Sequence, residues 1–323
     1  MSTVPTNSTA FAAITLSSIS YTDETQDGSP QQKTDIIAAL GNVAPQALGP
    51  WSLIWGPGTN NGNLVYVAIN AALNRVAVAI RGTVSEDSWS MLWSILQDSD
   101  PIVQDNWRYP ISNAGVKVAG GFDDGLENII AMTDPATDWS LLDFLRKTLA
   151  STQAELIVTG HSLGGALATM VALWLQDQLP KGGGPVNVRI TPYTFAAPTA
   201  GNQAFANLYD AKFPNSSRYV NSRDLVPMGY ANIAAMIANY APAPLLKNYS
   251  WLAYDTLYYA ASSLAPPTYV QTNQRQGTFV FSGPSPNGSN TFPQEADIQH
   301  SVLLYWRQLV FPTEMEAGKS AGA

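Results

Sequence analysis

The pentapeptide Gly-His-Ser-Leu-Gly at 160–164 has the composition of a nucleophile held on a tight turn. It follows the apolar run "ELIVT" and leads into "GALATMVALWL", which are the patterns of a buried strand and a helix. Glycines on both sides of a serine permit a sharp strand-to-helix turn, with the hydroxyl beside the N–H groups of a helix N-terminus. The pattern is short enough to arise by chance as an ordinary glycine-rich turn, and the flanking strand and helix favour Ser162 as a nucleophile.

A serine nucleophile needs a base to take its proton, and histidine titrates near neutral pH. The chain contains 2 histidines. His161 lies within the turn itself, where its side chain is expected to point away from that of Ser162. His300, in "EADIQHSVLLYW", is therefore the candidate base, and we expect it at the head of the last helix, after the last short strand. The alternative for His300 is an ordinary surface or helix-capping histidine.

The third group should be a carboxylate, because it must orient the imidazole and stabilise its cation. Asp224, in "RYVNSRDLVPMGY", follows a predicted strand and lies between the serine and the histidine. Asp210 and Asp255 stay open as alternatives on the sequence alone. Asp297 is a poorer candidate, because it lies three residues before His300 and cannot easily orient that ring from the same turn. The chain order is then nucleophile, acid, base.

Strands alternate with helices along the chain, which predicts an α/β fold with a mostly parallel central sheet flanked by helices. We expect one domain over 1–323, with a turn-rich break at 56–62 and a loose tail at 313–323. The expected strands are at 64–82 (two strands around a turn near Asn74), 154–160, 188–197, 217–222 and 277–283. The expected helices are at 10–19, 32–40, 86–98, 141–150, 164–179, 201–213 and 301–310.

The composition narrows the classes of function. Hydrophobic residues make up 46% of the chain and charged residues 12%, with a net charge of −8, so no basic surface for nucleic acid is expected. The absence of cysteine excludes disulfides and thiolate metal sites. We expect no transmembrane span, because no apolar run approaches about 18 residues. We see no signal peptide in the first residues, which lack a basic segment. Location and oligomeric state stay undetermined.

Several blocks in a fixed order extend this interpretation beyond the nucleophile. They are "VAVAIRGT", "GGFDDGLENI", "LIVTGHSLGGALATMVAL", "TPYTFAAPTAGNQAFANLYD", "RYVNSRDLVPMGY" and "DIQHSVLLYW". Together they resemble the class 3 lipase family, α/β-hydrolases that include fungal triacylglycerol lipases and feruloyl esterases, over roughly residues 63–310. The resemblance implies an α/β-hydrolase fold and a triad of Ser162, Asp224 and His300. It also implies an oxyanion hole formed by Thr83 and the backbone N–H of Leu163.

Two further segments are expected to shape the site. In "EDSWSMLWSILQDSD" four apolar residues recur at helical spacing, and they are Trp89, Leu92, Trp93 and Leu96. A helix that packs on the core would show the same pattern, but the resemblance implies a helical lid at about 84–99, which would contribute to lipid and acyl binding. The apolar segment at about 228–270 is predicted to be an insertion, which either walls an acyl groove or packs as ordinary core.

Two positions depart from the family pattern, since many relatives carry histidine where this chain has Ala119, and several where it has Met228. Neither departure touches the triad. We therefore expect a serine ester hydrolase, a lipase that cleaves acylglycerols at a lipid–water interface through an acyl-enzyme, with no metal and no cofactor. The alternatives are a short-chain, phospholipid or feruloyl esterase on the same scaffold and, more remotely, a non-catalytic protein that binds lipid interfaces.

Overall fold

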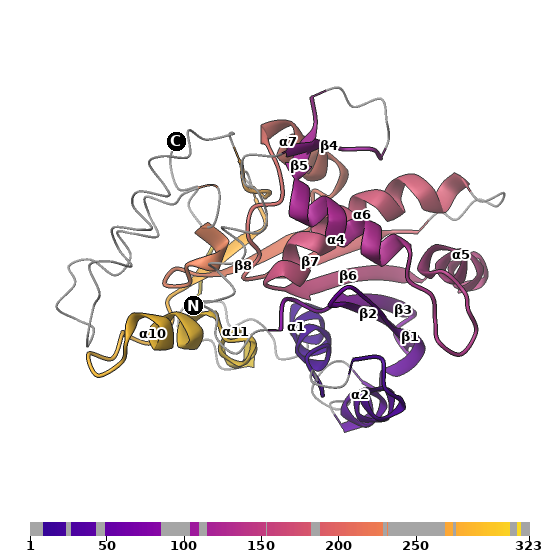
Figure 1. Cartoon of the computed structure of the whole chain (residues 1–323), viewed down its shortest axis with the longest axis horizontal. Helices are drawn as coiled ribbons and strands as arrows, with labels where there is room; N and C mark the ends of the chain where they lie inside the picture. The colour runs from indigo at the N-terminus through magenta and orange to yellow at the C-terminus, as the bar shows by residue number, and fades with distance from the viewer. Residues whose placement is uncertain are drawn as a thin grey trace.

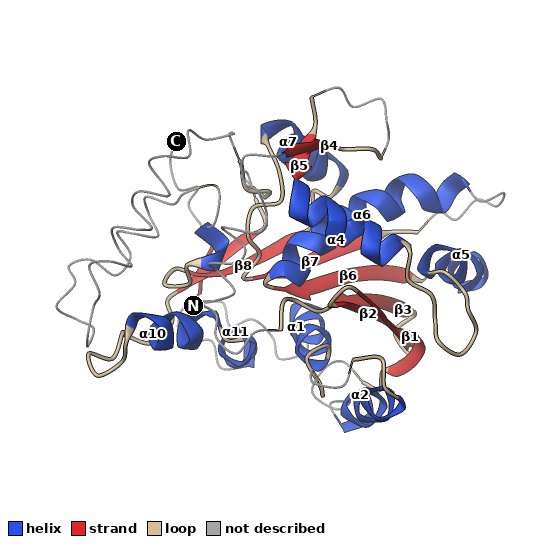
Figure 2. Cartoon of the chain, in the orientation of Figure 1, coloured by secondary structure: helices blue, strands red, loops and turns tan. Residues whose placement is uncertain are grey.

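A single twisted sheet organises the protein, seen in a computed structural model (Figure 1). The structure describes residues 9–23, 27–42, 49–84, 104–109, 115–152, 154–181, 188–228, 231, 269–273, 276–310 and 315–317. Within these ranges the sheet has eight strands in the order β1-β2-β3-β6-β7-β8-β9-β10. Helices cover both of its faces (Figure 2). This is the α/β architecture that the alternation of strands and helices predicts.

The centre of the sheet is parallel and its margins are antiparallel. The parallel strands are β3 (Arg75–Ile80), β6 (Glu155–His161), β7 (Ile190–Phe195), β8 (Ser217–Asn221) and β9 (Thr278–Phe281). The antiparallel additions are β1 (Ser52–Asn60) and β2 (Asn63–Asn70) at one margin and β10 (Met315–Ala317) at the other. A separate two-stranded ribbon pairs β4 (Gln104–Asn106) with β5 (Lys117–Ala119). Because parallel strands end at the same edge, the residues that follow β3, β6 and β8 lie together.

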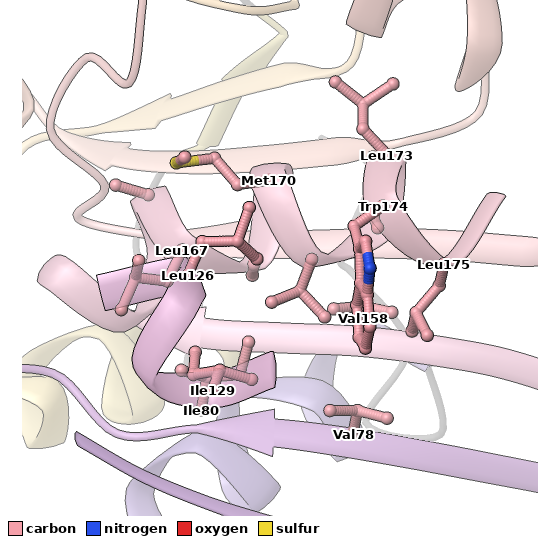
Figure 3. Packing of buried hydrophobic residues seen from close by; sticks show 14 of the residues in the cluster. Val78, Ile80, Leu126, Ile129, Val158, Leu167, Met170, Leu173, Trp174 and Leu175 are labelled. Atoms are coloured by element: carbon pink, nitrogen blue, oxygen red, sulfur yellow. The ribbon is translucent and has the colours of Figure 1, made fainter. Parts of the chain in front are cut away.

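Each face of the sheet carries its own hydrophobic core. On one face lie α4 (Gly120–Ile130), α5 (Leu141–Thr152), α6 (Leu163–Gln178) and α7 (Gln203–Lys212). Figure 3 shows Val78, Ile80 and Val158 of the strands against residues of α4 and α6. On the opposite face lie α1 (Thr9–Ile19), α2 (Pro30–Asn42) and α11 (Val302–Val310), with α10 (Phe292–His300) just before α11. A short 3₁₀ turn at Leu179–Lys181 follows α6, and another at Val226–Met228 lies in the loop after β8.

Helix α1 is apolar almost all round and is buried on the sheet. The Thr159 hydroxyl of β6 donates to the Ala13 carbonyl (3.2 Å), and the Tyr66 hydroxyl of β2 donates to the Leu16 carbonyl (2.6 Å). On its other side the indole N–H of Trp306 in α11 donates to the Thr15 hydroxyl (3.0 Å). Helix α1 is therefore fixed both to the strand that carries Ser162 and to the helix that follows His300.

The structure confirms the predicted elements that it describes, with several differences. The expected turn at 56–62 is wrong over most of its length, since β1 runs to Asn60 and shifts register near Gly58; β-bulges admit glycine and proline at such an edge. Helices α4 and α10 and the ribbon strands β4 and β5 were not predicted. Met315–Ala317, expected to be loose, pairs with the free edge of β9. None of the described helices is long and apolar enough to cross a bilayer.

Candidate active site

The turn between β6 and α6 places Ser162 at the carboxyl edge of the sheet. Ser162 has φ 60° and ψ −133°, a conformation that L-residues rarely adopt. A methyl group on Gly160 would collide with the Gly164 backbone, and one on Gly164 would collide with the Ile80 carbonyl of β3. The Ser162 N–H donates to the Phe195 carbonyl of β7 (2.9 Å). The glycines therefore permit a tight, strained turn that holds the serine between two neighbouring strands.

Three side chains from distant parts of the chain meet at this edge. The Ser162 hydroxyl lies 2.9 Å from Nε2 of His300, and Nδ1 of the same ring lies 2.8 Å from Oδ2 and 3.0 Å from Oδ1 of Asp224. A carboxylate only accepts, so Nδ1 carries the proton and Nε2 is free to accept from the serine. All three side chains are buried. The arrangement can remove a proton from the serine as its oxygen attacks an electrophile.

Two further residues fix the Asp224 carboxylate. The Tyr305 hydroxyl of α11 donates to Oδ2 (2.7 Å), and the Val226 N–H donates to Oδ1 (3.0 Å). Burial first, and then the negative charge of Asp224, raise the pKa of Tyr305 well above its ordinary value, so its hydroxyl keeps the proton that it donates. The Tyr305 hydroxyl also accepts from the N–H of Asn221, whose side chain donates to Gln299 next to the base (2.9 and 2.8 Å). The acid and base segments are thereby joined.

His161 is buried beside His300, and it is Nε2 of His300, not a nitrogen of His161, that lies 2.9 Å from the Ser162 hydroxyl. Its Nε2 lies 2.9 Å from the backbone carbonyl of His300, and the two rings pack with centroids 4.7 Å apart. Burial first, and then repulsion from a protonated His300, lower the pKa of His161 well below 6.5. His161 is therefore neutral, and Nε2 must be the donor, since a carbonyl only accepts.

The segment after β3 runs beside the nucleophile turn. Gly82 approaches so closely that a Cβ added there would lie 3.0 Å from the Ser162 Cβ. Thr83, the next residue, is half-buried, and Leu163 begins α6, whose first N–H groups have no partner within the helix. Both residues predicted for an oxyanion hole thus lie in the two backbone segments that flank Ser162.

The remaining predicted residues have different outcomes. Asp210 does not contact His300 and instead accepts from the Asn273 N–H (2.6 Å), and Asp255 lies outside the described residues. The predicted lid and acyl-binding residues also lie outside the described residues, and they are Trp89, Leu92, Trp93 and Leu96. Most of the segment 228–270 lies outside them as well. His300 is the last residue of α10, so the expectation that it begins the last helix was off by one helix boundary.

Sequence reasoning missed Tyr21, Asn221 and Tyr305, which contact the triad or the residues next to it. An asparagine that ends a buried strand was a usable signal for Asn221, because buried amides need partners. Helix α10, which was also missed, had a usable sequence signal too, since Thr291 and Gln294 form a capping box. No local pattern marks Tyr21 or Tyr305, whose hydroxyls matter only through contacts across the fold.

A serine on a strand-to-helix turn, followed along the chain by an acid and then a base, is the arrangement typical of serine hydrolase sites in the α/β-hydrolase fold. The family model "Lipase (class 3)" matches residues 77–232, a span that carries the nucleophile and the acid. Over residues 77–232 this chain is therefore similar to class 3 lipases.

Individual relatives agree with this placement. A secreted mono- and diacylglycerol lipase 1 of Fusarium solani is 31% identical over 170 residues, which are 53% of this chain and 44% of that protein. A phospholipase A1-II 4 of Oryza sativa subsp. japonica is 33% identical over 187 residues, which are 50% of this chain and 43% of that protein. The chain thus spans less than half the length of these two relatives.

The solved structure of M37 lipase superposes with a TM-score of 0.80, covering 95% of both chains at 22% identity. At that identity the likeness establishes the fold. The mostly parallel central sheet, covered by helices on both faces, agrees with an α/β-hydrolase fold.

Proposed function

We propose that this protein is a serine ester hydrolase that cleaves acylglycerols through a covalent acyl-enzyme. The observation that carries the proposal is the continuous chain of hydrogen bonds from Ser162 through His300 to Asp224. Buried hydroxyl, imidazole and carboxylate groups in this order have one well-understood use, which is to turn a weak alcohol nucleophile into an effective one.

The reaction has two halves. As His300 Nε2 takes the hydroxyl proton, Ser162 Oγ bonds to the ester carbonyl carbon, and the carbonyl oxygen takes up the negative charge. The carbon–oxygen bond to the alcohol then breaks, and the alcohol leaves with the proton from His300. Water attacks the acyl-enzyme with the same base, which releases the fatty acid and restores the serine. Throughout, Asp224 holds the ring by Nδ1 and stabilises the imidazolium.

We assign the oxyanion hole to the N–H of Leu163 and to Thr83, through its N–H and hydroxyl. The support is their place in the two segments beside Ser162, one at the start of α6 and the other just after β3. Donors placed there meet the charge as it develops, and the loss of one such donor commonly lowers kcat by about 10²–10³-fold. Thr83→Val keeps the N–H and removes the hydroxyl, so it isolates the side-chain part of this effect.

The acylglycerol substrate is supported by the named activity of the Fusarium relative and by the apolar pattern of two segments near the site in sequence. We propose that 84–99 is the lid, with Trp89 and Trp93 meeting the lipid interface, and that 228–270 contributes to acyl binding. Phospholipid is the second candidate substrate, because the Oryza relative is named a phospholipase A1.

Replacing the nucleophile tests the proposal directly. We expect Ser162→Ala to lower kcat on p-nitrophenyl esters by on the order of 10⁴-fold or more, while the fold is kept. Ser216→Ala is the matched control, since Ser216 is also buried and hydrogen-bonded but lies away from the triad. Hydrolysis by Ser162→Ala at the parent rate would refute the assignment.

The substrate class is tested with p-nitrophenyl esters of increasing acyl length, and with dispersions of diolein, triolein and phosphatidylcholine. We expect the highest kcat/KM on long acyl chains, and faster release of oleate from the acylglycerols than from phosphatidylcholine. A preference for phosphatidylcholine would favour the phospholipase alternative. An optimum at the shortest esters, with no release from triolein or diolein, would exclude a lipase.

A further inference from the structure

We infer that Tyr21 is a positioning residue: with His161 it forms a hydrogen-bonded relay that ties the oxyanion segment, the nucleophile turn and the backbone of the base together. The inference rests on the proposed function, and it assigns a role to a residue of the N-terminal segment, which the matched family span of 77–232 does not include.

The relay begins at the oxyanion segment. The Gly82 N–H, one residue before Thr83, donates to the Tyr21 hydroxyl (3.2 Å). Because that hydroxyl accepts from Gly82, its own proton is available to a second partner. Nδ1 of His161 is an acceptor within reach (3.1 Å), and the His161 carbonyl lies farther away at 3.4 Å. The tyrosine hydroxyl therefore joins the segment after β3 to the end of β6.

The imidazole of His161 continues the relay. Its Nε2 donates to the His300 carbonyl, which fixes the neutral tautomer and leaves Nδ1 unprotonated. Nδ1 is then the acceptor that the Tyr21 hydroxyl requires. Each donor in this sequence faces an acceptor, so the directions of all three hydrogen bonds are mutually consistent.

The last link acts on the base. His300 ends α10, and the carbonyls at a helix C-terminus lack partners within the helix. His161 supplies a partner for the carbonyl of the very residue whose ring must reach Ser162. The edge of the Tyr21 ring also packs on His161, with centroids 5.9 Å apart. Loss of the relay would allow the His300 backbone and the Gly82 segment to shift relative to Ser162.

The N-terminal segment is anchored well enough to serve this purpose. Tyr21 follows α1, which is bonded to β2, β6 and α11, and the Tyr21 N–H donates to the Ser18 carbonyl (3.2 Å). Six residues later Asp27 forms a salt bridge (2.5 Å) with Arg81, the residue before Gly82. The N-terminal segment therefore binds the two residues that follow β3: Asp27 forms a salt bridge with Arg81, and the Tyr21 hydroxyl accepts from the Gly82 N–H.

Kinetics of Tyr21→Phe test the relay against a purely structural role. We expect kcat on a soluble p-nitrophenyl ester to fall by about 10- to 100-fold with KM unchanged, because reacting groups lose their alignment while substrate contacts are kept. Tyr66→Phe is the matched control, because it removes a tyrosine hydroxyl that bonds to the α1 backbone but does not contact the relay. An equal kcat in the two variants, or a change in KM alone, would overturn the inference.

Two substitutions of His161 divide the relay. His161→Gln can keep a donor near the Nε2 position, and His161→Leu removes both ring nitrogens. We expect the Gln variant to recover at least part of the kcat lost in the Leu variant. In the Gln background, Tyr21→Phe should cost less than in the parent, because its acceptor is already gone. Full additivity of the two changes would contradict a shared relay.

Nuclear magnetic resonance provides a readout that does not depend on activity. With 2 histidines in the chain, ¹⁵N-labelled imidazoles give two sets of signals, which His161→Gln assigns. We expect the Nε2–H tautomer for His161, and Tyr21→Phe should shift its Nδ1 signal and also move those of His300. Unmoved His300 signals would overturn the relay even in an active enzyme. Shifted signals in a chain that hydrolyses no ester would instead refute the proposed function alone.

Discussion

The strained backbone of Ser162 leads to a stability prediction that reverses the usual order of alanine and glycine. At φ 60° and ψ −133° an L-residue costs of order 1–3 kcal/mol, and glycine is free of most of that cost. Glycine loses about 0.5–1 kcal/mol more entropy than alanine on folding. The balance makes Ser162→Gly more stable than Ser162→Ala by up to about 2.5 kcal/mol. Both variants lack the hydroxyl that bonds to His300, so that term cancels.

Urea unfolding at pH 7, followed by tryptophan fluorescence, measures the difference between the two variants. Ser216 provides the control position, because it is buried but does not have a positive φ. At this position Ser216→Ala should be more stable than Ser216→Gly. If Ser162→Ala proved more stable than Ser162→Gly by the ordinary 0.5–1 kcal/mol, the turn would not impose strain on the nucleophile. The argument that the fold holds Ser162 under strain would then fail.

Three further predictions follow from buried or crowded groups. Because folding lowers the pKa of His161, the unfolded chain binds an extra proton below about pH 6.5. As pH falls from 6.5 to 5, the parent should therefore lose up to about 1.4 kcal/mol of unfolding free energy per pH unit relative to His161→Gln. Urea unfolding at several pH values measures this difference. Burial acts to raise the pKa of Asp27, but the hydrogen bonds from Arg81 and its positive charge outweigh burial, so the pKa of Asp27 is lowered on folding. The Asp27–Arg81 pair therefore stabilises the fold fully above about pH 4, and this contribution is lost as pH falls through the folded pKa of Asp27. Asp27→Asn should therefore lower Tm at pH 7, and the gap to the parent should close below about pH 4; a gap independent of pH would contradict the pairing. Gly160→Ala should lower kcat more than 10-fold, because the added methyl displaces the turn, and parent-like kcat would show that the turn adapts.

The site was largely predictable because its chemistry restricts the residue types so strongly. A glycine-flanked serine after a strand, a chain with 2 histidines and an aspartate after a later strand leave few combinations, and the hydrogen bonds from Ser162 through His300 to Asp224 are present. The sheet was predictable for a similar reason, since long apolar runs such as β2, β3 and β6 leave little ambiguity.

The rest depends on contacts between distant residues. Tyr21 and His161 are 140 positions apart, and no local spacing reveals that one hydroxyl serves both the oxyanion segment and the nucleophile turn. β1 was mistaken for a turn because Gly56 and Gly58 normally interrupt strands. Its bulges, and the hydrogen bond from the Gly56 N–H to the Asp134 carboxylate (2.6 Å), are properties of the folded sheet.

The burial of α1 has a consequence for the order of folding. Helix α1 is synthesised before two of its hydrogen-bond partners. Its Thr15 hydroxyl bonds to the indole of Trp306, 291 positions later, and its Ala13 carbonyl bonds to Thr159. Until those partners leave the ribosome, a helix that is buried on nearly all sides in the folded protein lacks part of the surface that covers it. Closing so long a loop is slow, and it makes the nascent chain prone to aggregate. Productive folding of this chain should therefore depend on chaperones that shield α1 until α11 has been synthesised.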